Sequence, residues 1–255
     1  MTVLNSIYSF IFECEDLGRK AQFGHPYIPY CILIFYVLFC KWIGPSLMKN
    51  RKAFELKNLL IFYNFFQMMA NSYITIVTVI TVVTYWDQRC VHDITGHLAA
   101  GVLGRKLHTW HLYLIKFIDL LDAVFFVLRK KDKQITFLHV FHHVAVCWVY
   151  YRYIETLDMG FYLVITIAIN CFVHVIMYLY YFLAAFGPHM QKYLWWKKYL
   201  TTMQMMQFAI ILTYMSVSFA TGCNKAGAME ITFFLFILSL LALFANYYRK
   251  TFKTE

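Results

Sequence analysis

Seven runs of about 20 mainly apolar residues, each long enough to cross a bilayer as a helix, follow one another along the chain. Hydrophobic residues make up 61% of the 255 residues and charged residues 14%, which excludes an ordinary soluble domain. The sequence therefore predicts a single all-α integral membrane domain over residues 1–255. Its seven transmembrane helices are expected at about 27–47, 59–85, 108–128, 136–153, 160–182, 199–220 and 228–248.

The basic residues predict the orientation of these spans, because Lys and Arg gather on the cytosolic side of a membrane. One side carries fourteen of them and the other side seven; the fourteen fall within 49–57, 129–133, 192–198 and 249–253. We therefore expect a luminal segment at 1–26 and a cytosolic tail at 249–255. These flanks also account for the net charge of +10, so the charge does not indicate a nucleic-acid partner.

Polar side chains recur at one level in four successive spans. An ionisable group in hydrocarbon costs on the order of 3 kcal/mol, so such residues are expected to face an interior cavity. Counted from the cytosolic end at 1.5 Å per residue, all of them lie about 8–14 Å deep. They are Asp119 and Asp122 in the third span, His142 and His143 in the fourth, His174 in the fifth, and Gln204 and Gln207 in the sixth.

Helical spacing places these residues on one face of each span. Lys116, Asp119 and Asp122 recur every three residues, and His139 precedes His142 and His143 by three and four. Asn170, His174 and Tyr178 recur every four residues in the fifth span, which also favours a single face. The sequence therefore predicts one pocket that opens toward the cytosol.

Clustered imidazoles serve two chemistries, metal binding and acyl transfer. Histidines at this spacing can ligate zinc or iron, so a histidine-box metal-dependent oxidase or hydroxylase is the alternative enzyme. A neutral imidazole is also a competent nucleophile toward a thioester, and a neighbouring imidazole or carboxylate can hold its tautomer. Cys147, one turn past His143, is a rival nucleophile.

These polar residues also allow structural roles and non-enzyme functions. Taken singly, His174 and the two glutamines are typical of contacts between membrane helices, and Lys116 with its aspartates is typical of an ion-pair network. A receptor or a proton-coupled transporter could use the cluster as a switch or relay. The connections between the spans are short, and the polar residues lie nearer the cytosolic side than the membrane midplane, where transporters usually bind their substrates; both observations argue against these functions. The common depth of the polar residues in four spans favours an active site.

Four motifs carry a resemblance to a known family. They are RKAFELKNLLIFYNFFQ at 51–67, TFLHVFHH at 136–143, NCFVHVIMYLYY at 170–181 and TTMQMMQ at 201–207. In this order they resemble the very-long-chain fatty-acid elongases, the 3-ketoacyl-CoA synthases of the endoplasmic reticulum membrane. The resemblance covers roughly residues 45–250. It implies that six of the seven helices ring a substrate tunnel that is open to the cytosol.

The resemblance also implies a reaction and roles for residues. A long- or very-long-chain acyl-CoA condenses with malonyl-CoA to a 3-ketoacyl-CoA, with the acyl group held on His142 as an acyl-imidazole and His174 opposite. The other residues expected at the reaction centre are His139, His143, Asp119 and Asp122; those expected to bind substrate are Lys116, Arg129, Asn170, Tyr180, Lys197, Gln204, Gln207 and Arg249. Neither a metal nor another cofactor is implied.

Several expectations rest on the resemblance alone. An oxidising lumen allows a disulfide between Cys90 and Cys223, and the resemblance implies that they pair. It also implies surrounding membrane lipid and leaves room for a homodimer and for other elongation-cycle enzymes as partners.

The third-span motif departs from the family, with Asp119 for Glu and Ala123 for Thr. The terminal KTFKTE lacks a clear dilysine retrieval spacing.

Overall fold

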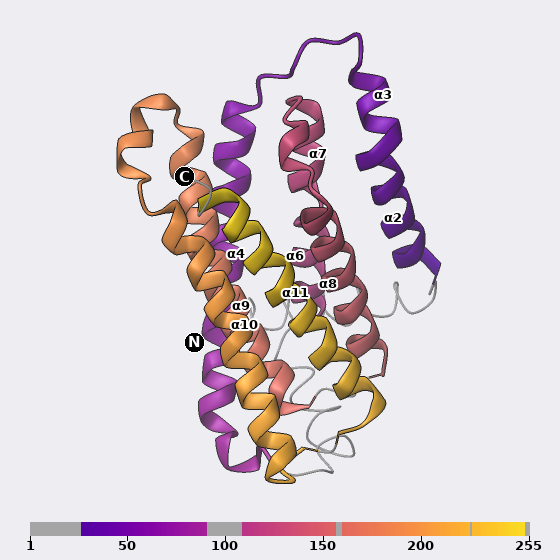
Figure 1. The fold of residues 1–255 in the computed structure, drawn as a ribbon, viewed down its shortest axis with the longest axis vertical. Coiled ribbons are helices and arrows are strands. Elements are labelled where there is room, and N and C mark those ends of the chain that lie inside the picture. Colours follow the sequence, from indigo (N-terminus) through magenta and orange to yellow (C-terminus); the bar gives the residue numbers. More distant parts are fainter. Residues whose placement is uncertain (1–26, 91–108, 157–159, 225, 253–255) are drawn as a thin grey trace, which may run out of the picture. The chain divides into compact units, whose positions relative to one another are not determined.

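The computed structural model describes residues 27–90, 109–156, 160–224 and 226–252, and every regular element in these ranges is helical (Figure 1). Five helical segments are long and apolar enough to cross a membrane: Tyr27–Met48, Lys57–Thr84, Phe161–Ala185, Lys197–Ala220 and Ala228–Phe252. They correspond to the first, second, fifth, sixth and seventh predicted spans. The chain is thus an all-α, multi-pass membrane protein.

The third and fourth predicted spans are helical but differ from the expectation. The third consists of two shorter helices, α6 (Thr109–Ile118) and α7 (Leu121–Leu128), and neither has the length of a span. The fourth is α8 (Phe137–Thr156), whose three histidines and Arg152 lower its apolar character. In the part of the chain that the structure describes, five spans rather than seven therefore meet the length and apolarity of a membrane helix.

The described helices group into two compact units. The first unit holds α2 (Tyr27–Leu38), the π-helical η1 (Phe39–Ile43), α3 (Gly44–Met48), α6, α7, the short η4 (Asp132–Gln134) and α8. The second holds α4 (Lys57–Thr84), η2 (Trp86–Gln88), α9 (Phe161–Ala185), η5 (Pro188–Tyr193), α10 (Lys197–Ala220) and α11 (Ala228–Phe252). The predicted single domain over residues 1–255 stays a prediction.

In the first unit, α2 packs its buried face against the third and fourth predicted spans. Leu33 and Tyr36 share one apolar core with Leu120 and Val140. The helix continues through η1 and α3 to Met48, close to the predicted end of the first span at about 47. Pro45 lies in the first turn of α3, where a missing amide hydrogen is tolerated.

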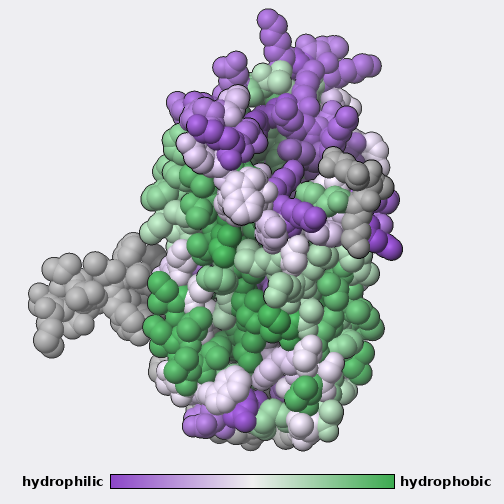
Figure 2. All heavy atoms as spheres, turned by 60° about the vertical axis from the view of Figure 1, so that its left-hand side comes forward, coloured by the Kyte–Doolittle hydropathy of each residue, from purple (hydrophilic) through white to green (hydrophobic). Residues whose placement is uncertain are grey.

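In the second unit, α4 lies along α9, and α10 packs on both α9 and α11. Tyr63 of α4 meets Tyr178 of α9 edge to face, with ring centroids 6.1 Å apart. Phe62, Ile210 and Leu235 are exposed apolar residues of these helices. On the face shown in Figure 2, hydrophobic side chains cover the middle of the helices and hydrophilic ones gather toward the ends, as lipid contact requires.

A disulfide closes one end of the second unit. It joins Cys90, beyond the C-terminal end of α4, to Cys223, beyond the C-terminal end of α10. Gly222 has a φ of +69°, in the left-handed region that glycine adopts freely, and this turns the chain after α10. The pairing is the one that the family resemblance implies, and it places these two helix ends on one side of the membrane.

We expect a Cys90→Ser/Cys223→Ser double variant to unfold at a lower temperature than the wild type. The bridge joins residues 133 positions apart, and such a cross-link contributes on the order of 2–4 kcal/mol by restricting the unfolded chain. Thermal unfolding in detergent, followed by tryptophan fluorescence, measures the effect. Cys31→Ser, at an exposed free cysteine, is the matched control. A double variant as stable as this control would contradict the expectation.

Candidate active site

Three of the predicted catalytic residues form a cluster at the start of α8. Thr136 precedes the helix, and its Oγ1 accepts a hydrogen bond from the His139 amide at 3.2 Å, the arrangement of an N-cap. The His139 and His143 rings lie 4.4 Å apart between centroids, and the His142 and His143 rings 5.6 Å apart. His143 is buried, whereas His139 and His142 are half-buried. The i, i+3, i+4 spacing thus becomes a group of adjacent imidazoles.

The donor atoms of this cluster do not form a metal site in the structure. Metal binding needs several nitrogen, sulfur or oxygen donors that converge on one point. Within the described ranges, no group of three or more His, Cys, Asp or Glu side chains has an arrangement that could hold a metal ion. This part of the chain therefore contains no preformed set of ligands for the metal that the alternative enzyme would need.

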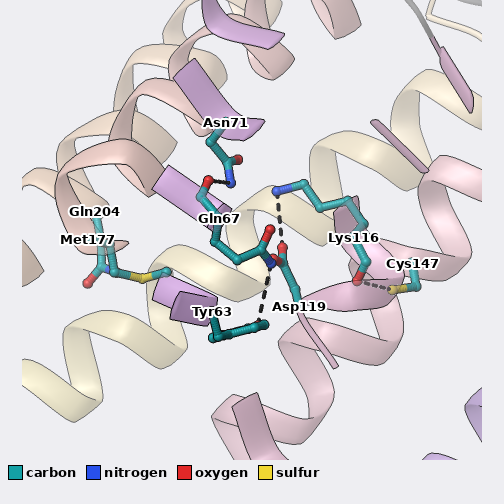
Figure 3. A network of polar contacts seen from close by, with 8 residues as sticks. All are labelled: Tyr63, Gln67, Asn71, Lys116, Asp119, Cys147, Met177 and Gln204. Carbon is teal, nitrogen blue, oxygen red and sulfur yellow. Dashed lines mark hydrogen bonds and ion pairs between the residues drawn. The ribbon is translucent and has the colours of Figure 1, made fainter. Parts of the chain in front are cut away.

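A buried ion pair lies where α6 ends. Lys116 Nζ is 3.4 Å from Asp119 Oδ2, and the two side chains are 2% and 3% exposed (Figure 3). An ammonium held in a low-dielectric interior is well suited to stabilise negative charge that develops on a nearby oxygen. Asp122 lies in the first turn of α7 and is half-buried.

Cys147 is directed at the backbone of α6. Its thiol donates a hydrogen bond to the Lys116 carbonyl oxygen at 3.1 Å, and the side chain is buried (Figure 3). The rival hypothesis expects a Cys–His pair, in which this thiol would meet an imidazole. In the structure the thiol is engaged by a carbonyl oxygen instead.

The predicted residues of the fifth and sixth spans lie in the second unit. His174 is buried on α9, with its ring centroid 5.9 Å from that of Tyr178. Gln204 of α10 donates from Nε2 to the Met177 sulfur at 3.5 Å, a contact between two helices, and Gln207 is buried on the same helix. Asn170 is half-buried on α9. The convergence of these residues with the α8 histidines on one pocket stays a prediction.

A polar stripe on α4 was not among the predicted site residues. Gln67 and Asn71 are both 0% exposed. Gln67 Nε2 lies 3.4 Å from the Tyr63 hydroxyl, and Asn71 Nδ2 donates to the Gln67 carbonyl at 2.8 Å (Figure 3). The four-residue spacing of these three residues was the available signal in the sequence. Buried polar groups in a membrane helix are candidates for function.

The residues predicted to contact coenzyme A occupy different environments. Lys197 and Arg249 are exposed near helix ends, where they are accessible to an anionic ligand, and Arg129 is half-buried at the end of α7. Tyr180 instead packs in an apolar cluster with Leu194 and lies 5.0 Å from the Trp196 ring. The positive charges of the basic residues suit them to bind phosphate groups. The surroundings of Tyr180 are those of a packing residue.

These helices and side chains define a multi-pass membrane protein that carries a histidine cluster on α8 and a buried ion pair at the end of α6. A family model described as the GNS1/SUR4 family, ELO, matches residues 21–255. The chain belongs to this family. The membership predicted from the four sequence motifs is thereby confirmed.

Several relatives carry names that agree with the family. Very long chain fatty acid elongase 7 of Rattus norvegicus is 43% identical over 196 residues, which cover 76% of this chain and 69% of the relative. Elongase F of Drosophila melanogaster is 40% identical over 213 residues, 82% of each chain. Elongase 4 of Macaca mulatta is 35% identical over 235 residues, 89% of this chain and 72% of the relative.

Proposed function

We propose that this protein is a fatty acid elongase that condenses a long- or very-long-chain acyl-CoA with malonyl-CoA to a 3-ketoacyl-CoA. The histidine cluster of α8, with the buried Lys116 ammonium in the same unit, is the observation that supports this chemistry most directly. Family membership and the names of the relatives support fatty acid elongation as the process.

In the proposed reaction, an imidazole nitrogen of His142 attacks the acyl-CoA thioester and displaces the coenzyme A thiolate, which takes up the proton that the acylated imidazole loses. Malonyl-CoA then loses CO2, and the resulting carbanion attacks the acyl-imidazole carbonyl. The new carbon–carbon bond forms as the bond to the imidazole breaks, and the released imidazole nitrogen takes up a proton from water, which restores neutral His142. His139 and His143 hold the imidazole tautomer, and Lys116 stabilises the oxyanion. His174 assists from α9, and Asp122 polarises the site.

The proposal includes the setting of this reaction. Seven helices cross the membrane of the endoplasmic reticulum, with the N-terminus in the lumen and the C-terminus in the cytosol, and six of them ring an acyl tunnel. Lys197, Arg249 and Arg129 bind the coenzyme A phosphates at the cytosolic side, because cations are the natural partners of phosphate. The reaction uses the two CoA thioesters as substrates and needs no further cofactor.

Incubation of the purified protein with labelled malonyl-CoA and a panel of acyl-CoAs tests the proposal. Mass spectrometry should detect a 3-ketoacyl-CoA two carbons longer than the acyl substrate, and labelled CO2 should form in equal amount when the label is on the malonyl carboxyl. Product formation should persist after treatment with a chelator. The absence of a 3-keto product at every chain length in the panel would refute the proposed activity.

We expect Asp119→Glu to change the rate or the chain-length preference of condensation by a few-fold. The extra methylene moves the carboxylate by about 1.5 Å, which alters its contact with Lys116 and the position of the ammonium. The measurement is kcat/KM across the acyl-CoA panel. Asp132→Glu, in the exposed η4 turn, makes the same chemical change away from the cluster. An unchanged profile at Asp119 would make its carboxylate purely structural.

A further inference from the structure

The third predicted span is broken at Asp119 and Leu120, although the residues around the break include neither proline nor glycine. Sharp bends in helices almost always have a proline, a small residue, a π-bulge or a side chain inserted into the backbone ladder as their cause. In a regular helix the Lys116 carbonyl would accept the Leu120 amide. Here the Leu120 amide donates to Phe117, three residues back, at 3.2 Å.

Cys147 supplies the inserted side chain. Its thiol donates to the Lys116 carbonyl at 3.1 Å, which is the backbone group that a break at Leu120 displaces from the regular pattern. Cys147 and Leu120 belong to one buried apolar core, so water does not compete for this bond. A carbonyl displaced from helical geometry in such a core needs another donor, and the thiol meets that need.

The same thiol sets the position of α8 along α6. Cys147 follows His143 by four residues and His139 by eight, so all three residues lie on one face of α8. A hydrogen bond from this face to the Lys116 backbone fixes both the rotation and the height of α8 against α6. The residue whose carbonyl is bound carries the ammonium of the buried ion pair.

We propose that Cys147 is a positioning residue: its thiol holds the break between α6 and α7 and thereby keeps the Lys116–Asp119 pair in register with the histidines of α8. The catalytic consequence rests on the proposed condensation, whereas the structural consequence does not. In this role Cys147 takes no part in bond making, because its thiol serves as a donor to the backbone.

Three variants separate the donor from the volume of the side chain. Cys147→Ser keeps a donor, Cys147→Ala removes it, and Cys147→Val fills the space without one. Cys40→Ala is the matched control, since Cys40 is a buried cysteine of the same apolar core and lies on η1 rather than on α8.

Hydrogen–deuterium exchange of the peptide that spans residues 114–124 measures how stable the backbone is around the break, and it requires no enzymatic activity. We expect exchange in this segment to be about 5-fold faster in Cys147→Ala, the effect of one lost net hydrogen bond, and close to wild type in Cys147→Ser and Cys40→Ala. If Cys147→Ala does not fold, Cys147→Val takes its place. Wild-type exchange in the donor-free variants, or equal acceleration in the Ser variant, would overturn the proposal.

The condensation kinetics of the same variants test the catalytic consequence. We expect kcat for condensation to fall about 10- to 100-fold in Cys147→Ala with the KM for malonyl-CoA unchanged, and to recover in Cys147→Ser. Unchanged kcat in Cys147→Ala, or an acyl group trapped on Cys147, would overturn the positioning role. A wild-type protein without any 3-keto product would refute the proposed function instead, and the exchange experiment alone would then decide the role of Cys147.

Discussion

His142→Ala is expected to abolish condensation while leaving the protein folded. The substitution removes the nitrogen that carries the acyl group in the proposed reaction, and loss of a nucleophile lowers kcat by roughly 10³-fold or more. His142 is half-buried at the start of a helix, and alanine is the best helix former, so folding should tolerate the change. Release of labelled CO2 and size-exclusion chromatography in detergent measure activity and folding.

A second histidine provides the control for this prediction. His189 is exposed in η5, and His189→Ala should retain wild-type turnover. In the wild type, incubation with acyl-CoA alone should give a protein heavier by one acyl group, and fragmentation should place that group on His142. Full turnover by His142→Ala would move the nucleophile elsewhere, and the next residues to test would be Cys147 and Cys171, the buried cysteines of α8 and α9.

Lys116→Met is expected to lower the free energy of unfolding by about 3 kcal/mol and to reduce condensation sharply. It removes the ammonium from a buried ion pair and leaves the Asp119 carboxylate in a low-dielectric interior, which is costly. The proposed oxyanion partner is lost in the same step, at a cost to kcat of about 100-fold or more. Thermal unfolding in detergent and condensation kinetics give the two quantities.

A double-mutant cycle separates stability from activity. Lys116→Met/Asp119→Leu replaces both charges by apolar groups of similar size, so much of the lost stability should return, whereas the lost turnover should not. Lys192→Met, at an exposed lysine of η5, should change the unfolding free energy by less than about 0.5 kcal/mol. A double variant that also recovers turnover would show that Lys116 and Asp119 act only in folding.

The sequence predicted much of the fold because hydropathy and helical spacing are local properties. Five predicted spans appear as apolar helices, and the spacing of the α8 histidines predicted their adjacency. The first span runs past Pro45 because the proline follows a π-helical stretch and lies in the first turn of α3, where its missing amide hydrogen is tolerated. Gln67 and Asn71 were overlooked as site residues, since an amide within an apolar span is read equally well as a helix contact.

The chain by itself determined where its helices form, which side chains share a helix face and which family it belongs to, because these depend on residues a few positions apart or on motif order. Only the tertiary structure decided that the third span breaks at Asp119 and what the Cys147 thiol contacts. That break has no local signal: the donor that replaces the helical hydrogen bond comes from a residue 31 positions away, brought there by the packing of two helices.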